Sequence, residues 1–308
     1  MLQPSTILLL FLAIGLPSPV SAQEIKTFRV SDFDLRGNVK SCLVLTDYGK
    51  EEYHFDESGR LTRSITRYSD SDYEVTHYKY RNGELMEKRV ENYRDNTFDK
   101  DTSLAYFYQI DTAGNRKVTE KIVSYNKQLL EQNMYRYHPD GKLTKIVRTD
   151  TDGTDHTTIR YDTLDGKVTV TRKLNREPLK SVQTWRRDSQ DGSPQQLKLT
   201  EIFFDGLPNI KIEEVRNANG DLISRAEFLY DAPTEKWMPQ EEVTYDYDES
   251  GTLVRSKTKR RNAVSTTEFI YQFDGTEAHN WVKKIKTPEN SYTTRKIRYY
   301  KSADKADG

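Results

Sequence analysis

The sequence has very little cysteine: Cys42 is the single one in 308 residues. An internal disulfide is therefore excluded, and the fold must be held together without covalent cross-links. We expect Cys42 to be a small buried apolar side chain next to Val44. Charge of one sign is also lacking, because 48 basic residues face 48 acidic ones. That balance gives no long-range attraction to nucleic acid or to an anionic membrane.

Long hydrophobic runs are lacking too, apart from residues 7–16 near the N-terminus. This run is shorter than the roughly 20 residues of a membrane span. It is followed by Pro17, Pro19 and the small residues Ser21 and Ala22, which is the pattern of a secretory signal peptide over residues 1–22. An uncleaved anchor is the alternative. We therefore predict an exported protein, periplasmic or extracellular, with no membrane insertion after signal cleavage.

Apolar residues are scarce, at 34% of the chain with a mean hydropathy of −0.88. Such a polar composition on its own is typical of disorder. Disordered chains are poor in aromatic residues, however, and this one has 20 Tyr, 11 Phe and 3 Trp. We infer a folded protein in which tyrosine supplies much of the buried surface.

Signatures of catalysis are absent. The sequence has no Gly-x-Ser-x-Gly, no phosphate-binding loop and no His-Glu-x-x-His. The five histidines are dispersed without the spacing of zinc ligands, and residues 150–155 miss the first and last ligand positions of a calcium loop, so we expect a hairpin turn there. We therefore predict no enzyme, no cofactor and no metal site, while a carboxylate pair of a glycoside hydrolase stays open.

A degenerate repeat is the main positive feature. Its core is aromatic-x-aromatic, a polar turn ending in Gly, one residue, and then Leu or Val. Strong copies are Tyr53-x-Phe55-Asp56-x-x-Gly59-x-Leu61 and Tyr245-x-Tyr247-Asp248-x-x-Gly251-x-Leu253. The recurring glycines follow one another at steps of 24 to 31 residues: Gly59, Gly83, Gly114, Gly141, Gly166, Gly192, Gly220, Gly251 and Gly275.

The repeat predicts antiparallel hairpins. Aromatic-x-aromatic places two rings on one face of a strand, because side chains alternate. Asp or Asn followed by Gly gives the positive-φ turn that reverses the chain. Each step fits two strands and two turns, so we expect roughly ten two-stranded units. Residues 128–132 are the best helical candidate, but they fall where the repeat requires a strand, and we predict a strand.

The predicted fold is all-β: an antiparallel meander of tandem hairpins that forms an extended or curled sheet. A closed propeller does not suit two-stranded units, and strands such as residues 63–67 lack a lipid-compatible face. The predicted domains are a signal peptide (1–22), an N-terminal linker (23–34), the repeat domain (35–300) and a polar C-terminal tail (301–308).

These copies resemble the tyrosine-aspartate (YD, or RHS-type) repeats of exported bacterial proteins. Two further segments are similar to pieces of short secreted Bacteroidetes members of that group: the opening residues 35–41 and the closing residues 280–284 and 295–299. The resemblance implies a non-enzymatic β-repeat scaffold at the cell envelope. Large members of the family enclose toxins in hollow shells, whereas this chain is short and shows no toxin domain.

The three tryptophans are the candidate binding residues, because an exposed indole stacks on a sugar ring or anchors a protein interface. We choose Trp237, in a predicted Pro-flanked loop over residues 231–239, and Trp185. Trp281 belongs to the closing segment and is predicted to be structural. The leading hypothesis is a non-catalytic surface that binds a protein or glycan of the envelope. The alternatives are an assembly factor acting by β-strand addition and a carboxylate-based glycoside hydrolase.

Overall fold

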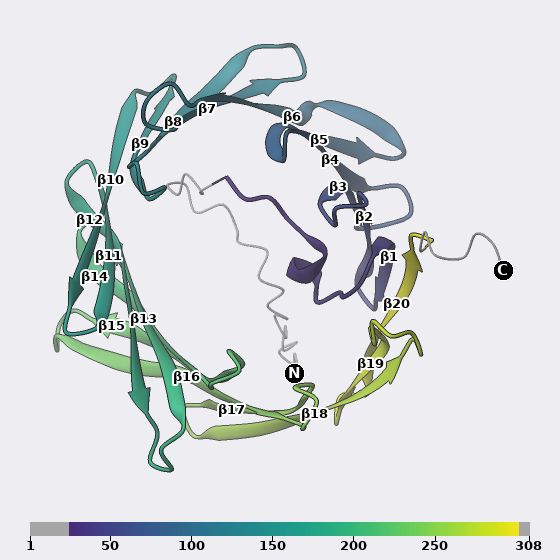
Figure 1. The fold of residues 1–308 in the computed structure, drawn as a ribbon, viewed down its shortest axis with the longest axis vertical. Helices are drawn as coiled ribbons and strands as arrows, with labels where there is room; N and C mark the ends of the chain where they lie inside the picture. The colour runs from purple at the N-terminus through teal and green to yellow at the C-terminus, as the bar shows by residue number, and fades with distance from the viewer. Residues whose placement is uncertain (1–24, 302–308) are drawn as a thin grey trace, which may run out of the picture.

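The computed structural model describes residues 25–301, which form one twenty-stranded antiparallel sheet and one short 3-10 helix (Figure 1). The predicted signal peptide and residues 302–308 lie outside the described residues. The helix is η1 (Val30–Phe33). The strands are β1 (Val39–Thr46), β2 (Gly49–Phe55), β3 (Leu61–Arg67), β4 (Tyr73–Arg81), β5 (Glu84–Arg94), β6 (Thr97–Asp111), β7 (Lys117–Ser124), β8 (Leu129–Tyr137), β9 (Leu143–Asp150), β10 (Thr154–Leu164), β11 (Lys167–Leu174), β12 (Glu177–Asp188), β13 (Pro194–Phe204), β14 (Leu207–Arg216), β15 (Leu222–Asp231), β16 (Lys236–Tyr247), β17 (Leu253–Arg260), β18 (Ala263–Phe273), β19 (Trp281–Thr287) and β20 (Ser291–Tyr299).

The sheet is a closed barrel, so the prediction of an extended or curled open sheet is wrong. Each strand pairs with the next, and β20 also pairs with β1 in a register from Val39↔Tyr299 to Leu45↔Thr294. The physical reason for closure is that an open sheet leaves two rows of unpaired backbone groups at its edges. Figure 1 shows the resulting ring. The all-β class and the ten two-stranded units are confirmed, and residues 129–132 belong to strand β8 as predicted.

The recurring glycines lie at chain reversals, as predicted. All nine have a positive φ, a backbone region that residues with a Cβ rarely adopt. The aspartate of the motif closes the same turn: Asp248 Oδ1 accepts hydrogen bonds from the backbone N–H groups of Ser250 and Thr252, both at 2.9 Å. Asp56 makes the equivalent bonds in the first copy. The aspartate is thus a structural acceptor that fixes the turn.

The second aromatic residue of the motif links one repeat to the preceding one. Tyr80 donates its hydroxyl hydrogen to the backbone carbonyl of Leu61 at 2.8 Å, and Tyr247 donates to Leu222 at 2.9 Å. Each acceptor is the apolar residue two positions after the glycine of the earlier repeat. These bonds explain why the repeat favours tyrosine: the ring supplies apolar contact and the hydroxyl pairs a backbone group.

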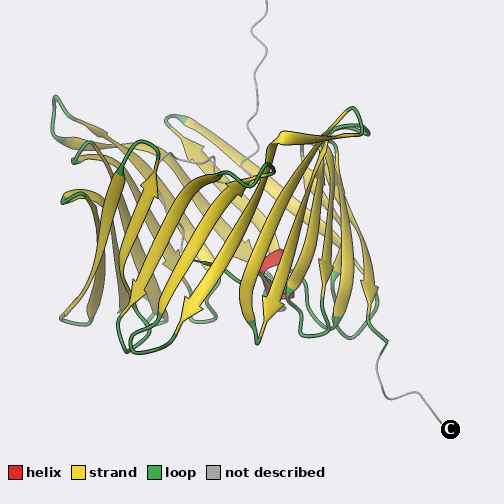
Figure 2. Cartoon of the chain, turned by 90° about the horizontal axis from the view of Figure 1, so that it is seen from above, coloured by secondary structure: helices red, strands yellow, loops and turns green. Residues whose placement is uncertain are grey.

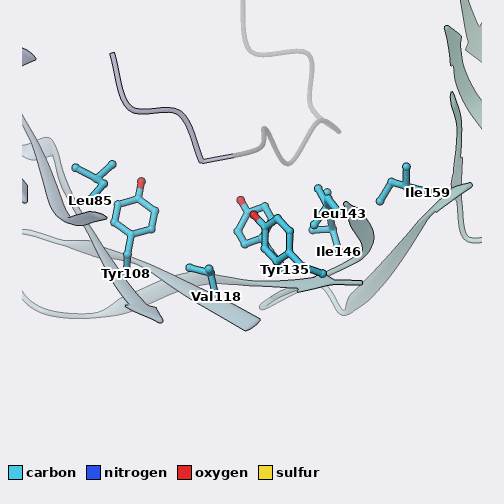
Figure 3. Close-up of a cluster of buried hydrophobic side chains, with 8 residues drawn as sticks. Leu85, Tyr108, Val118, Tyr135, Leu143, Ile146 and Ile159 are labelled. Atoms are coloured by element: carbon cyan, nitrogen blue, oxygen red, sulfur yellow. The ribbon is translucent and has the colours of Figure 1, made fainter. Parts of the chain in front are cut away.

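The paired aromatic rings point into the barrel. A cluster of buried side chains on β5 to β10, here called the tyrosine cluster, forms much of this interior. Figure 3 shows its side chains directed toward the interior of the barrel, where Ile25 packs against the cluster. Its members are Leu85, Tyr108, Val118, Tyr135, Tyr137, Leu143, Ile146 and Ile159.

The space inside the ring is partly filled by residues 25–38, here called the inner segment (Figure 1). Barrels of about sixteen or more strands enclose more space than their own side chains fill. Phe33 of the inner segment packs on Tyr53 and Phe55 of β2, at ring-centroid distances of 4.3 and 5.4 Å. Cys42 is buried in the same apolar group, as predicted. The inner segment thus completes the core against β1, β2 and β20.

The two rims of the barrel differ in chemistry. Connections from even to odd strands carry the glycine turns and form one rim; connections from odd to even strands form the other. Of the ten large hydrophobic side chains in residues 25–301 that are more than half exposed, eight lie at the second rim. We call this set the apolar rim: Tyr48, Tyr68, Tyr125, Leu129, Phe204, Leu207, Val264 and Tyr292.

The turn aspartates predict a dependence of stability on acid. Hydrogen bonds from the Ser250 side chain and the Thr252 backbone lower the pKa of Asp248, and bonds from Lys142 lower the pKa of Asp140 to about 2. A carboxylate whose pKa is lower in the folded state stabilises the fold above its unfolded pKa, near 3.8. That contribution is lost as the pH falls through the lower, folded value. Urea midpoints should therefore fall as the pH drops from about 5 toward 2.

One repeat supplies a natural control for this effect, because Asn217 occupies the turn position and its Oδ1 accepts the same bonds. We expect Asp248→Asn to be less stable than the parent chain at pH 7 and equal to it near pH 2. Asn217→Asp is not the mirror of this change, because the Asn217 amide donates to Asp221 Oδ2 at 3.0 Å and a carboxylate there would lose that bond and repel Asp221. For Asp248→Asn, a difference from the parent chain that is the same at every pH would show that the charge has no part in it.

Candidate functional site

Charged side chains on the inner wall of β7 to β10 are held by hydrogen bonds from neutral side chains and by ion pairs. Glu120 is buried and accepts hydrogen bonds from the Tyr135 hydroxyl at 2.8 Å and the Asn133 amide at 3.1 Å. Arg148 contacts Glu131 and Asp150, both at 2.7 Å, and the bond to Glu131 raises the pKa of the guanidinium. Most polar groups on the inner wall of β7 to β10 are therefore paired, and Asn133 Oδ1 is the buried side-chain oxygen of this wall that has no hydrogen-bond partner among the described residues.

The outer wall carries a cleft of about 460 Å³ over strands β14 to β17. Its lining residues are Glu213, Val215, Ser224, Ala226, Phe228, Pro239, Gln240, Glu241, Glu242, Lys259 and Arg261. This set is here called the outer cleft. Most of these residues alternate with those that face the lumen, as the pleat of a strand requires.

Small residues create the hollow. In the register of β14, β15 and β16, Ala226 lies between Glu213 on one side and Glu242 on the other. Alanine carries no atoms beyond Cβ, so the two longer side chains stand as walls around a shallow floor. A bulge between Glu227 and Phe228 further disturbs the pairing of β15 with β16 next to Pro239.

Trp237 lies beside this cleft, in a strand and not in the loop that the sequence predicted. It is the second residue of β16, because the connection from β15 is only residues 232–235. Its indole meets the Tyr230 ring edge-on at 5.1 Å. The Lys211 ammonium lies 4.1 Å from the Phe228 ring centroid and 5.7 Å from the indole. Phe228, which lines the cleft, and Trp237 therefore share one cation on the outer wall.

Trp185 lies on the other side of the outer cleft, on strand β12. It pairs with Leu197, which pairs with Val215 of the cleft. The Lys167 ammonium lies 4.6 Å from its ring. The structure thus places both predicted tryptophans on the same outer wall, each half-buried and two strands from β14.

Trp281, which was predicted to be structural, is buried and takes part in fixing the inner segment. Its indole N–H donates to Asp34 Oδ2 at 2.7 Å, and the Arg295 guanidinium lies 3.5 Å from its ring. The neighbouring Asn280 accepts from the Arg36 N–H and donates to the Arg36 carbonyl, both at 2.8 Å. These contacts leave Trp281 unable to meet a ligand.

Comparison with known proteins gives only distant likenesses. The sequence matches no family model and no curated protein, so the resemblance to YD repeats is not confirmed at that level. Similar solved structures include porin-like proteins from Bacteroides uniformis (11% identity, covering 84% of this chain and 96% of that chain, TM-score 0.33) and Bacteroides vulgatus (10%, 85% and 98%, TM-score 0.24). A TcdB2-TccC3 structure is also similar (10% identity, 82% of this chain and 19% of that chain, TM-score 0.18). All three scores are below 0.5, so no property of these proteins is transferred.

The remaining sequence candidates lie elsewhere. Residues 151–153 form the turn between β9 and β10, as predicted, and residues 25–301 contain no group of three or more potential metal ligands. No helix in the described part of the chain has the length and apolar character to cross a membrane. Because β1 and β20 pair with each other, the strand-addition alternative lacks the free edge that it needs.

Sequence reasoning missed Phe228, Lys211 and the acidic walls of the outer cleft. In the sequence, Phe228 lies within the strand-like run of residues 222–231, where it could equally face the core. The available signal is the alternation in residues 224–228, where Ser224 and Ala226 are unusually small for one face of a strand that ends in aromatic residues.

Proposed function

We propose that this chain is an exported, non-catalytic β-barrel of the bacterial envelope that binds a glycan at the outer cleft. The observation that carries the proposal is one surface combining an apolar floor, aromatic rings and charged side chains of both signs. A protein ligand is the other occupant expected from the sequence. The YD-type resemblance supports the same envelope role.

The chemistry of the outer cleft suits a sugar. Aromatic rings such as Phe228 and Trp237 accommodate the C–H face of a pyranose. Glu213 and Glu242 provide hydroxyl acceptors, and Lys259 and Arg261 provide donors. A few convergent polar groups around an apolar floor are the usual composition of a small-ligand site.

The outer wall also supports a location in water. Strands β2 and β3 place Glu52, His54 and Arg63 together on it, and strands β4 and β5 place Lys79 beside Glu87 at 3.2 Å. An arginine or lysine facing lipid at the bilayer midplane costs about 2–4 kcal/mol. Charges on successive strands therefore favour a barrel that does not insert into a bilayer.

The outer cleft favours binding over catalysis, because a single sheet layer gives it no second wall to exclude water. A glycoside hydrolase stays the second candidate for one reason. Glu213 and Glu242 lie two strand spacings apart, about 10 Å between Cα atoms, and inverting enzymes hold their carboxyl groups roughly 6.5–9.5 Å apart.

A glycan array followed by calorimetry tests the proposal. We expect Trp237→Ala to weaken glycan binding about tenfold, or about 1.4 kcal/mol, because an aromatic anchor beside the cleft is lost. The control is Tyr292→Ala, a more exposed aromatic residue on β20, which should leave the affinity unchanged. The proposal fails if the parent chain binds no glycan. Release of reducing ends that Glu213→Gln abolishes would favour the hydrolase instead.

A further inference from the structure

We propose that the apolar rim docks on the surface of a lipid bilayer. Its side chains include eight of the ten large apolar groups in residues 25–301 that are more than half exposed, with Tyr48 74% and Phe204 69% accessible. They lie at or next to the turns that connect odd to even strands, where no other part of the described chain covers them. Isolated exposed apolar residues are common on proteins, but their gathering on one rim is not.

The opposite rim shows that this distribution is not a general property of hairpin turns. Each of its nine connections contains Gly together with Asp or Asn, and Leu164 is the one large apolar residue there that is more than half exposed within the described chain. The inner segment contacts two turns of the opposite rim, at Gly59 and at Ala278, whereas the turn glycines from Gly114 to Gly251 on that rim have open space around them. The difference in side chains therefore points to different surroundings.

The arrangement fits a bilayer better than a protein partner. The apolar rim draws its members from six of the ten odd-to-even connections, from Tyr48 between β1 and β2 to Tyr292 at the start of β20. The hairpins reach unequal heights at this rim, the upper one in Figure 2. A rigid partner, such as a second copy of the chain, would contact only the turns that extend furthest. In a fluid bilayer surface, each hairpin tip can insert to a different depth. Tyrosine, with its apolar ring and polar hydroxyl, is typical of such interfaces.

Charge at the apolar rim is mixed. The exposed acidic residue Asp47 is next to Tyr48, and Asp205 is next to Phe204. The basic residue Lys127 lies two positions after Tyr125, and Arg261 lies three positions before Val264. No net attraction to an anionic surface results. The docking should therefore depend on apolar contact and be little affected by salt or by anionic lipid.

Vesicle co-sedimentation tests the proposal, using phosphatidylcholine alone and phosphatidylcholine mixed with phosphatidylglycerol. We expect the full chain to bind both, and the triple variant Tyr48→Ser/Tyr125→Ser/Phe204→Ser to bind about tenfold less, since affinity follows the apolar area inserted. The control is Leu164→Ser, which removes an equally exposed side chain (74%) from the opposite rim. Circular dichroism shows whether each variant retains its fold.

Three results would overturn the proposal: no binding of the parent chain to either vesicle, equal losses in the rim variant and the Leu164→Ser control, or binding that needs the anionic lipid. Light scattering tests whether a second copy of the chain occupies the apolar rim instead. A dimer that forms with the parent chain and not with the triple variant would assign the rim to a second copy. Glycan binding at the outer cleft involves none of these positions, so failure of one proposal leaves the other standing.

Discussion

Replacing Tyr135 by alanine should lower the free energy of unfolding by about 4 kcal/mol. Tyr135 is the largest of the fully buried side chains, with 1% of its surface accessible, and lies at the centre of the tyrosine cluster. Its removal leaves a cavity against Val118 and Ile146. It also removes the hydroxyl donor from the buried Glu120, which then keeps fewer partners for its charge. Urea denaturation at neutral pH measures the loss.

The variant Tyr135→Phe separates the two contributions. It keeps the ring and removes only the hydrogen bond, so we expect a loss of about 1.5–2 kcal/mol, the usual value for a bond to a charged group. A matched control is Tyr125→Ala, since that ring stands exposed at the apolar rim and should cost under about 1 kcal/mol. Equal effects at the two alanine positions would contradict a core that is organised around Tyr135.

Replacing Asn280 by alanine should cost about 2–3 kcal/mol and loosen the inner segment. Asn280 is 2% exposed and makes three hydrogen bonds, two to the backbone of Arg36 and one to the Tyr299 hydroxyl at 2.7 Å. Alanine leaves the Arg36 N–H and carbonyl groups without these partners. Trypsin should then cleave faster after Arg36 or Arg29, which are exposed but held in place.

The form of the hydrogen bonds allows a sharper test. Asn280→Asp keeps an acceptor for the Arg36 N–H but places a second acceptor against the Arg36 carbonyl, so we expect a loss at least as large as that of alanine at pH 7. Removing a surface amide, as in Gln272→Ala, should change neither the stability nor the cleavage rate. Unchanged proteolysis in both Asn280 variants would show that the inner segment is held by its apolar contacts alone.

Most of the local structure could be predicted from the sequence, because the information is local. An aspartate, a glycine at positive φ and two alternating aromatic residues define a hairpin within about ten residues. Gly59 and Gly251 sit in nearly identical turns for this reason. Gln132 was correctly predicted to lie in a strand, because the repeat requires a strand there even though the surrounding residues favour a helix.

Closure of the barrel could not be predicted in the same way. It depends on the pairing of β1 with β20, whose partners Cys42 and Ile297 are separated by most of the chain. The sequence of neither strand identifies the other as its partner, since both show the same alternation of apolar and polar side chains as the other strands. In the structure, the opening and closing segments singled out by resemblance meet through Asn280 and Arg36.

The residues of the proposed binding surface were predicted only in part. Trp185 and Trp237 were chosen as exposed indoles, and the structure places both on the outer wall but half-buried. Which of the two faces of a strand points to the lumen depends on how the complete barrel closes. Because of this, the small residues Ser224 and Ala226 marked one face of the strand in the sequence without showing that this face is the outer one.

Each hairpin contacts the hairpins that precede and follow it in the chain, and the pairing of β1 with β20 joins the first hairpin to the last. Duplicating or deleting one whole repeat would therefore change the circumference by two strands and leave every other pairing intact. Every remaining turn would also stay on its own rim, because a unit of two strands begins and ends at the same rim. The width of this architecture is thus an evolvable quantity that varies in discrete steps, independent of the chemistry of its walls.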